Sequence, residues 1–178
     1  MNEEILIHQL RDATLRKEAF SRLVQLYQRK VYNIIRKMVI SHDDTDDLVQ
    51  EVFIKVWNNI EQFKGESQLF TWIYRIATNE CLNFLRKRNR WSMFSMEGNE
   101  ALIEMLASEV QPDTEEVQLK LQKAILHLPD KQRMVFNLKY FEELSYEEIA
   151  AITETSVGAL KASYHHAVKK IEEFFNRH

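Results

Sequence analysis

The sequence contains few residues that form tight turns. It has three glycines and two prolines among 178 residues, whereas these two types together usually make up about 12% of a protein. A β-sandwich or barrel needs many such turns, and a dinucleotide-binding loop needs paired glycines, so both classes are excluded. Apolar residues make up 45% of the chain, which excludes wholesale disorder. Long stretches of mixed charged and apolar residues without breakers predict an all-α protein.

Cysteines and long apolar runs are also scarce. Cys81 is the only cysteine, so no internal disulfide can form, and no cysteine–histidine cluster offers a zinc site. We therefore expect no metal and no cofactor. The N-terminal segment is acidic and lacks the apolar core of a secretory signal, and no apolar run is long enough to span a membrane. These features predict a cytoplasmic protein without membrane insertion.

The net charge of −3 is unevenly distributed. Bases outnumber acids by 15 to 12 over residues 1–95, whereas acids outnumber bases by 15 to 9 over residues 96–178. Residues 92–118 contain seven acids and no lysine or arginine. A basic block precedes this acidic stretch, formed by Arg86, Lys87, Arg88 and Arg90. Such a change of charge indicates a boundary between modules, and we expect a flexible acidic linker at residues 93–112.

The first predicted domain, residues 3–92, is a helical bundle. Apolar residues at helical spacing predict a long helix that stops near Ile40. Ser41 begins a second helix, because its hydroxyl and the aspartates that follow stabilise a helix N-terminus. A loop containing Gly65 leads to a third helix, which Ser67 can cap and which ends in the basic block. Three or four packed helices bury these apolar faces most simply.

The second predicted domain, residues 113–178, contains a helix-turn-helix. Pro129 ends one helix, and Asp130 is expected to cap the next. Ser145, with a glutamate three residues later, has the spacing of a capping box. A four-residue turn separates this short helix from a last helix that begins after Ser156. Two helices joined by so short a turn form a helix-turn-helix.

The outward face of the last helix is a candidate DNA-binding surface. An α-helix fits the major groove of duplex DNA, and small residues near its start let the backbone approach the base edges. A mildly basic, solvated face on an ordinary helical hairpin explains the same residues. The candidate side chains along this face are those of Ser156, Gly158, Lys161, Ser163, His165, His166 and Lys169.

The third helix and the loop before it interleave aromatic, cationic and amide side chains. Single-stranded nucleic acid is bound by cationic grooves that follow the phosphates and by aromatic rings that stack on bases. Aromatic residues at helical spacing are also the ordinary content of a hydrophobic core, so both interpretations stay open. The candidates are Phe63, Lys64, Arg75, Asn79, Asn83, Arg86 and Lys87.

The second helix combines acidic and apolar side chains on one face. This combination suits docking on a basic helix of a partner protein, although a solvated acidic face is the simpler explanation. The residues of this face are Asp46, Asp47, Gln50, Glu51 and Ile54.

Two segments of the sequence resemble one known family, the extracytoplasmic-function sigma factors, which are small alternative initiation subunits of bacterial RNA polymerase. Residues 41–88 resemble the promoter-melting domain, above all in the run DLVQEVFIKVW followed by FTWIYRIATN. Residues 128–175 are similar to the C-terminal helix-turn-helix of this family, a motif that many other regulators share. The order of the two segments and the connector between them also match the family.

The resemblance implies roles for the residues of the first domain. Asp46, Asp47, Gln50, Glu51 and Ile54 match the segment that docks on the coiled-coil clamp of the largest polymerase subunit. The resemblance also implies a pocket for a base flipped out of the non-template strand at the −10 element, matched by Phe63, Lys64 and Asn79. Phosphates or neighbouring bases would be held by the next side chains on the same helix, Arg75, Asn83, Arg86 and Lys87.

The resemblance further implies that the helix after Ser156 reads the −35 element in duplex DNA. This sequence departs from the common pattern of the family in two places. Glu154 stands where a turn glycine is frequent, and Thr153 and Thr155 replace residues that are usually apolar. The second departure is on the reading helix, where positions that commonly hold arginine carry Ser163, His166 and Val168. Fewer arginines mean fewer contacts to guanines and phosphates.

The sequence therefore predicts an alternative sigma factor that binds core RNA polymerase and directs promoter-specific initiation. It would read the −35 duplex and capture a flipped −10 base, and an anti-sigma factor is an expected further partner. A stand-alone helix-turn-helix regulator is the alternative. No serine or cysteine lies in a motif that activates a nucleophile, so we expect no enzymatic activity.

Overall fold

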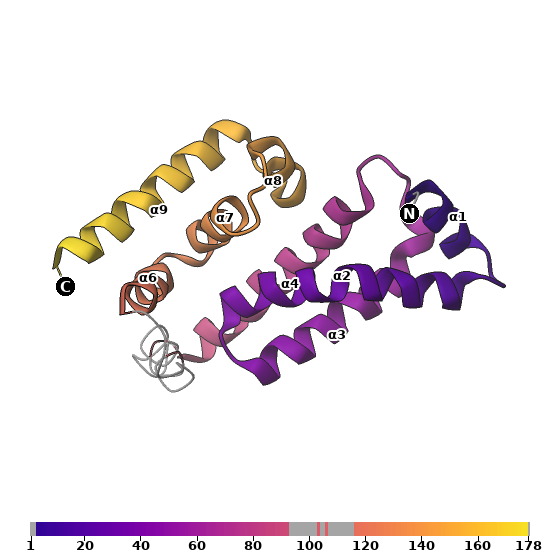
Figure 1. The fold of residues 1–178 in the computed structure, drawn as a ribbon, viewed down its shortest axis with the longest axis horizontal. Coiled ribbons are helices and arrows are strands. Elements are labelled where there is room, and N and C mark those ends of the chain that lie inside the picture. Colours follow the sequence, from indigo (N-terminus) through magenta and orange to yellow (C-terminus); the bar gives the residue numbers. More distant parts are fainter. Residues whose placement is uncertain (1–2, 93–102, 104–105, 107–115, 178) are drawn as a thin grey trace.

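The structure, a computed structural model, describes residues 3–92, 103, 106 and 116–177. Every regular element in these residues is helical, which confirms the predicted all-α class. The N-terminal elements are α1 (Glu3–Arg11), α2 (Arg16–Val39), α3 (His42–Asn59), the short 3₁₀-helix η1 (Ile60–Gln62) and α4 (Leu69–Ser92). The C-terminal elements, shown in Figure 1, are α6 (Glu116–Leu126), α7 (Asp130–Tyr140), α8 (Tyr146–Thr153) and α9 (Val157–Arg177). Each described helix is too short or too polar to cross a membrane.

The N-terminal domain is built on α2, α3 and α4, which pack against one another. Figure 1 shows α2 and α3 side by side, with α1 at the far end of the bundle. Helix α1 was not predicted as a separate element. It forms because acids occupy its first turn and bases its last, and because Leu6 and Leu10, one turn apart, are both buried against the bundle.

The connection between α2 and α3 is a tight turn at Ile40. This residue has a φ of 68°, which is rare for a β-branched side chain. The amide of Ser41 donates to the carbonyl of Val39 at 2.9 Å, which closes a three-residue γ-turn. The hydroxyl of Ser41 then accepts from the amide of Asp44 at 3.2 Å. The end of the first long helix near Ile40 and the cap at Ser41 are therefore confirmed.

The start of α4 is held by a residue that the sequence did not indicate. The helix begins at Leu69, and the amide of Leu69 donates to the carboxylate of Glu3 at 2.6 Å. The N-terminus of a helix favours a carboxylate, because its first amides lack partners and its dipole is positive there. A distant acid from α1 thus stabilises the helix start, one residue later than a cap at Ser67 predicts.

The C-terminal domain consists of α6, α7 and α8 packed against the long helix α9. The predicted capping box is confirmed, because the Ser145 hydroxyl accepts from the Glu148 amide and the Glu148 carboxylate accepts from the Ser145 amide. The cap at Ser156 is also confirmed, with the amide of Ala159 at 3.3 Å from its hydroxyl. The expected cap at Asp130 is wrong. Pro129 is the cap residue, and Asp130 is the first residue of α7.

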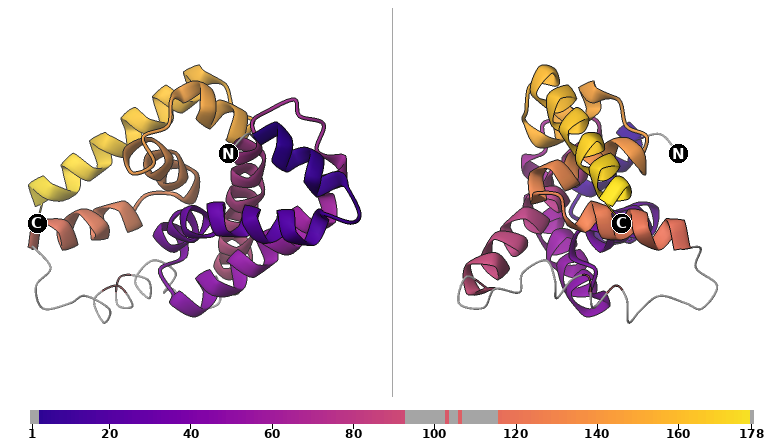
Figure 2. Two further views of the ribbon diagram at one scale, coloured as in Figure 1. Left: turned by 45° about the vertical axis from the view of Figure 1, so that its right-hand side comes forward. Right: turned by 90° about the vertical axis from the view of Figure 1, so that its left-hand side faces the viewer.

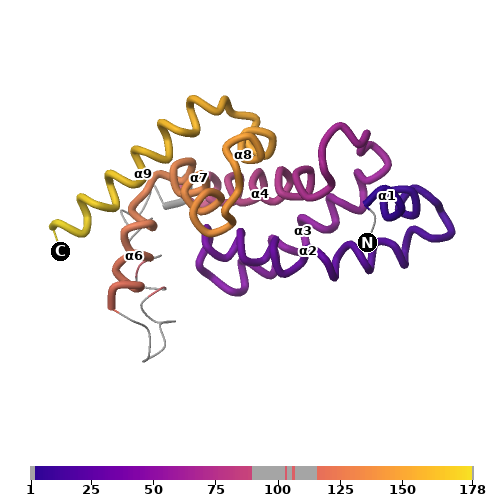
Figure 3. The backbone as a smooth tube through the Cα atoms, turned by 45° about the horizontal axis from the view of Figure 1, so that its top comes forward, coloured from indigo at the N-terminus to yellow at the C-terminus, as the bar shows by residue number. Residues whose placement is uncertain are grey.

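The two domains pack directly on each other. Helices α7 and α8 lie against α2 and α4, as Figure 3 and the left view of Figure 2 show. The buried apolar core is continuous across this boundary, since one cluster joins residues of α1 to α4 with residues of the second domain. The members from the C-terminal domain are Met134, Val135, Leu138, Ile149, Ile152 and Leu160.

The acidic linker predicted at residues 93–112 lies outside the described residues, apart from Ile103 and Leu106. Leu106 is buried against Ile40 and Leu126, which places this point of the connector at the junction of the two domains. The linker's flexibility and the limits of the domains at residues 3–92 and 113–178 stay predictions.

Candidate nucleic-acid and protein-binding surfaces

The acidic face of α3 is exposed as the sequence predicts. All five predicted docking residues have exposed side chains, and Ile54 is 59% exposed. The opposite side of the helix carries Leu48, Val52 and Val56, which are buried in the core. Helical spacing therefore separates a structural face from a solvent-facing one. An exposed isoleucine beside several carboxylates can bind a partner that offers an apolar groove and positive charge.

A hollow of about 360 Å³ lies where the loop after η1 meets α4. Phe63, Lys64 and Arg75 all line it, so the structure brings three of the predicted −10 residues together. Phe63 is only 4% exposed, and its ring centroid lies 5.2 Å from that of Trp72, which also lines the hollow. The Phe63 ring therefore forms a wall of the hollow and is not a freely exposed stacking platform.

The loop that carries Phe63 and Lys64 is tied to the bundle on one side. The guanidinium of Arg11 donates to the carbonyl of Phe63, which ties the loop to α1. Gly65 follows with a φ of 77°, a conformation that glycine adopts without steric cost. Gly65 thus allows the turn, and the bond from Arg11 restrains the rim of the hollow before any ligand binds, which lowers the entropy lost on binding.

The remaining −10 candidates lie farther along α4. Asn79 is exposed one turn after Arg75, and Arg86 is exposed two turns later. Asn83 and Lys87 line a second hollow of about 160 Å³, together with carboxylates of α3. The structure therefore does not gather all seven candidates at one point. It spreads them along α4. Carboxylates of α3 lie beside Asn83 and Lys87 in the second hollow.

The side chain of Arg75 already has partners in the C-terminal domain. Its Nε and Nη2 atoms donate to the carbonyl oxygen of Ala151 at 3.2 and 2.7 Å. Its Nη1 atom lies 3.2 Å from Oε1 of Glu154. A residue predicted to hold DNA thus contacts the turn of the helix-turn-helix. The only signal in the sequence was the glutamate at a turn position where glycine is frequent.

Helix α9 presents the predicted −35 residues on its solvent side. The side chains of Lys161, His165, His166 and Lys169 are exposed, while Ser163 is half-buried. Gly158 and the capping residue Ser156 are exposed at the start of the helix. Apart from the neighbouring residues and the backbone of its own helix, no described atom lies within 4 Å of where a Cβ at Gly158 would be, so packing against other parts of the chain does not require glycine there.

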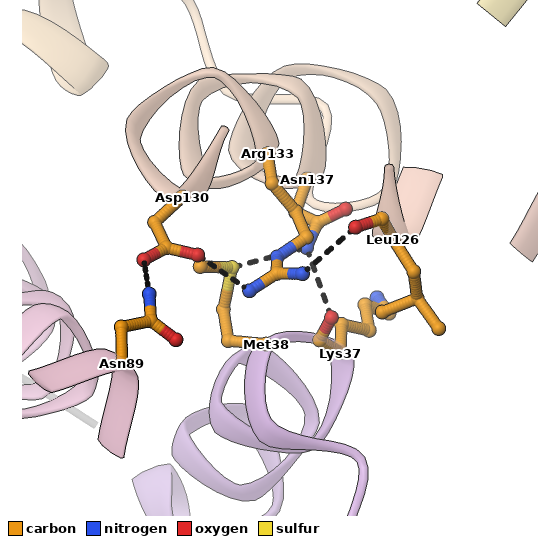
Figure 4. Close-up of polar contacts among 7 residues, drawn as sticks. All are labelled: Lys37, Met38, Asn89, Leu126, Asp130, Arg133 and Asn137. Atoms are coloured by element: carbon orange, nitrogen blue, oxygen red, sulfur yellow. Dashed lines mark hydrogen bonds and ion pairs between the residues drawn. The ribbon is translucent and has the colours of Figure 1, made fainter. Parts of the chain in front are cut away.

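A polar network at the domain boundary was not predicted from the sequence (Figure 4). The guanidinium of Arg133 is fully buried and donates to Asp130 at 2.9 Å and to the carbonyl of Leu126 at 3.4 Å. Asp130 also accepts from the amide of Asn89 on α4 at 3.1 Å. Burial lowers the pKa of Arg133 from its usual range, because a desolvated charge is unfavourable. Sequence reasoning placed Asp130 at a cap and missed this role.

The described residues offer little for covalent or metal chemistry. Burial raises the pKa of the Cys81 thiol to about 12, so its reactive thiolate form is scarce at neutral pH. Within the described ranges, no group of three histidine, cysteine or acidic side chains is placed to hold a metal ion. The arrangement is instead suited to binding: an acidic docking face, a preformed hollow and an exposed helix.

Comparisons with known proteins match both parts of the chain to one family. The family model of Sigma-70 region 2 matches residues 23–91, and that of Sigma-70 region 4 matches residues 118–171. The chain is 36% identical to the ECF RNA polymerase sigma factor SigW of Bacillus subtilis, over 84% of each chain. It is 33% identical to the ECF RNA polymerase sigma-E factor of Escherichia coli, over 97% of this chain and 93% of that one.

Two solved structures share the fold. One is the sigma factor RpoE in complex with the anti-sigma factor NepR from Bartonella quintana, with a TM-score of 0.68, 24% identity and coverage of 88% of this chain and 96% of that one. The other is CnrH in complex with the cytosolic domain of CnrY, with a TM-score of 0.71, 22% identity and coverage of 98% and 97%.

Proposed function

Because this chain belongs to the extracytoplasmic-function sigma factors of the sigma-70 family, and so directs promoter-specific transcription, we propose how its surfaces divide that work. The exposed face of α3 docks on the clamp of the largest polymerase subunit through Ile54 and the acids around it. The hollow beside Phe63 and the exposed side of α4 take the −10 strand. The outward side of α9 reads the −35 duplex.

The preformed hollow is the observation that carries the −10 assignment. Its volume of about 360 Å³ is within the usual size range of ligand pockets, about 300–1,000 Å³. Phe63 and Trp72 give it aromatic walls, Lys64 and Arg75 bring positive charge to its rim, and Glu66 adds one negative charge. A base that has left the stack has lost a few kcal/mol of stacking, and binding to such a site offsets that loss. Capture of the flipped base then shifts the melting equilibrium toward the open state.

The −35 assignment rests on the exposure and chemistry of α9. Lys161 and Lys169 can contact phosphates, and the two adjacent histidines and Ser163 offer hydrogen bonds to base edges or backbone. With a net charge of −3, the free chain binds duplex weakly, and polymerase supplies much of the phosphate contact. The chain itself performs no chemistry in this scheme, and it acts in the cytoplasm, where polymerase is found.

An anti-sigma factor is a further proposed partner. The two solved structures described above are complexes, one of a sigma factor with the anti-sigma factor NepR and one of CnrH with the cytosolic domain of CnrY. This likeness in fold supports a partner that would control the chain by sequestration.

The experiment that tests this function is run-off transcription with purified core polymerase on a library of genomic promoters. We expect this chain to enable initiation that core polymerase alone does not support, and the active promoters to share one −35 and one −10 element. A stand-alone regulator would not replace the sigma subunit. Failure of the chain to bind core polymerase or to initiate from any promoter would contradict the proposal.

A further inference from the structure

We propose that Glu154 is a self-inhibiting residue, which holds Arg75 in the domain interface and so keeps this one side chain of the −10 hollow from pairing with a strand. The inference rests on the proposed role of that hollow. It differs from sequestration by a partner, because every contact it requires lies within this one chain.

The first support is that Arg75 contributes both to the −10 hollow and to the interface between the domains. Its side chain lines the hollow with Phe63 and Lys64, and the same guanidinium makes three contacts to the C-terminal domain. Two of these contacts share the carbonyl of Ala151, and the third reaches the carboxylate of Glu154. A phosphate that is to pair with these same N–H groups of Arg75 has to displace the C-terminal domain from them.

The second support is the backbone at Glu154. This residue ends α8 in the left-handed conformation, with a φ of 53° and a ψ of 38°. Glycine adopts this conformation without a steric penalty, whereas a residue with a Cβ does not. A glutamate at this position is therefore unfavourable for the turn by itself. The ion pair across the domain boundary is the physical gain that the structure shows for it.

The third support is that other contacts stabilise the same closed arrangement. Lys37 of α2 pairs with Glu142, which precedes α8, at 3.0 Å. Ile149 and Ile152 of α8 are buried in the core cluster that includes α4 residues. Arg75 and Glu154 therefore lie at the edge of a packed interface. Their pairing adds to closure that apolar contacts already favour.

The closed arrangement leaves the side chains of Lys161, His165, His166 and Lys169 exposed on the −35 helix, so the competition concerns the −10 strand. Ser156, the cap of α9, lies only two residues beyond Glu154, so the turn that holds Arg75 also leads into the −35 helix. Strand binding and domain closure then compete, and by reciprocity anything that separates the domains raises affinity for the strand. If only the open form binds, the apparent dissociation constant falls in proportion to the gain in open form.

The test uses the full chain and compares Glu154→Gln with Glu143→Gln. Glu143 is exposed, lies in the loop before α8 and has a similar φ of 55°, and no cross-domain contact of its side chain is seen in the described residues. The two variants thus change charge equally. A second pair of variants, Glu154→Gly and Glu143→Gly, removes the steric cost of the left-handed backbone equally at both positions. This pair serves as the test if a glutamine variant folds poorly.

Two measurements are made on each variant. Phenylglyoxal modification, followed by mass spectrometry, gives the labelling rate of Arg75 relative to the exposed Arg86. Fluorescence anisotropy with a fluorescein-labelled twelve-nucleotide oligothymidylate gives affinity for single strands. For an ion pair at this level of exposure, we expect Glu154→Gln to raise the labelling rate of Arg75 and the affinity for the oligonucleotide by about two- to fivefold each. Glu143→Gln is expected to leave both unchanged.

Three results would overturn the inference: an unchanged labelling rate of Arg75 in Glu154→Gln, an equal rise in Glu143→Gln, or faster labelling without tighter strand binding. Run-off transcription by the wild-type chain separates these outcomes from the proposed function. If the wild type initiates transcription while the variants behave alike, the proposed function stands and the self-inhibition fails.

Discussion

The side-chain amide of Asn137 on α7 donates to the main-chain carbonyl of Lys37 near the end of α2, at 3.3 Å, although 100 residues separate them. Lys37 is among the last residues of α2, whose carbonyls have no partner within the helix. The same amide nitrogen lies 3.4 Å from the sulfur of Met38. A residue of the C-terminal domain thus completes the hydrogen bonding of an N-terminal helix.

Asn137→Ala is therefore expected to weaken the closed structure. The substitution leaves the carbonyl of Lys37 without this donor in a buried setting, which costs about 1–3 kcal/mol. Urea denaturation monitored by circular dichroism measures the change. Asn176→Ala, at an exposed position on α9, is the matched control and is expected to have no measurable effect. Equal stabilities for the two variants would show that this contact does not stabilise the protein.

Ser145→Ala is expected to lower the stability of the helix-turn-helix. The substitution removes the hydroxyl that accepts from the Glu148 amide, and loss of such a cap costs about 1 kcal/mol. Differential scanning calorimetry should show a lower Tm. Ser21→Ala is a suitable control, because the hydroxyl of Ser21 only bonds back to the Lys17 carbonyl within α2. A Tm for Ser145→Ala no lower than that of the control would contradict the capping role.

The same capping box predicts a loss of stability in acid. Hydrogen bonds from the hydroxyl and the amide of Ser145 lower the pKa of Glu148 below its usual 4.5. A carboxyl whose pKa falls on folding stabilises the protein above its unfolded pKa, and that contribution is lost as the pH drops through the folded value. Glu148→Gln should flatten the fall in stability below pH 4.5, as measured by urea titration at several pH values. An unchanged slope would show that Glu148 does not contribute.

Ile54→Glu is expected to weaken binding to core polymerase. Burying an isoleucine side chain contributes about 1.5–3 kcal/mol, so its replacement by a charge should raise the Kd by about tenfold or more. Leu26→Glu is the control, because Leu26 is another exposed aliphatic residue, at 47%, on a helix outside the proposed docking face. Surface plasmon resonance with immobilised core polymerase compares the two. A similar loss for both variants would argue against a specific role for α3.

Asn79→Ala is expected to reduce open-complex formation more than closed-complex binding. A side-chain amide that hydrogen-bonds a flipped base acts only after melting, and its loss should lower the open-complex yield about two- to tenfold. Permanganate footprinting measures melted thymines, and gel shift on ice measures closed complexes. Asn33→Ala on α2 provides an exposed control. An equal loss in both steps for Asn79→Ala would contradict contact with a flipped base.

Much of the local structure followed from short-range patterns. Ser41 and Ser145 cap helices as predicted, because a hydroxyl and the amide it accepts from are only three residues apart. The exposed face of α3 followed from helical spacing alone. Asp130 was misassigned because a pattern of neighbouring residues does not reveal that its carboxylate is occupied by Arg133 and Asn89.

The −10 site was only partly predictable for the same reason. Resemblance to a family indicated Phe63 and Lys64, and the structure places both at one hollow. It did not indicate that the Phe63 ring is nearly buried against Trp72, or that Glu3 holds the start of α4. Burial and capping of this kind depend on which helices pack against each other, and the local sequence pattern does not specify this packing.

The amino-acid sequence by itself determined the long helices, the caps at Ser41, Ser145 and Ser156, and the family, because helical spacing, capping and motif order act between residues that are close along the chain. The tertiary structure alone decided that Arg75 contacts Ala151 and Glu154 and that Asn137 completes the end of α2. These contacts join residues 76 to 100 positions apart. They form only after apolar faces on α2, α4, α7 and α8 bring the two domains together, and the free energy of that packing is a sum over the whole interface.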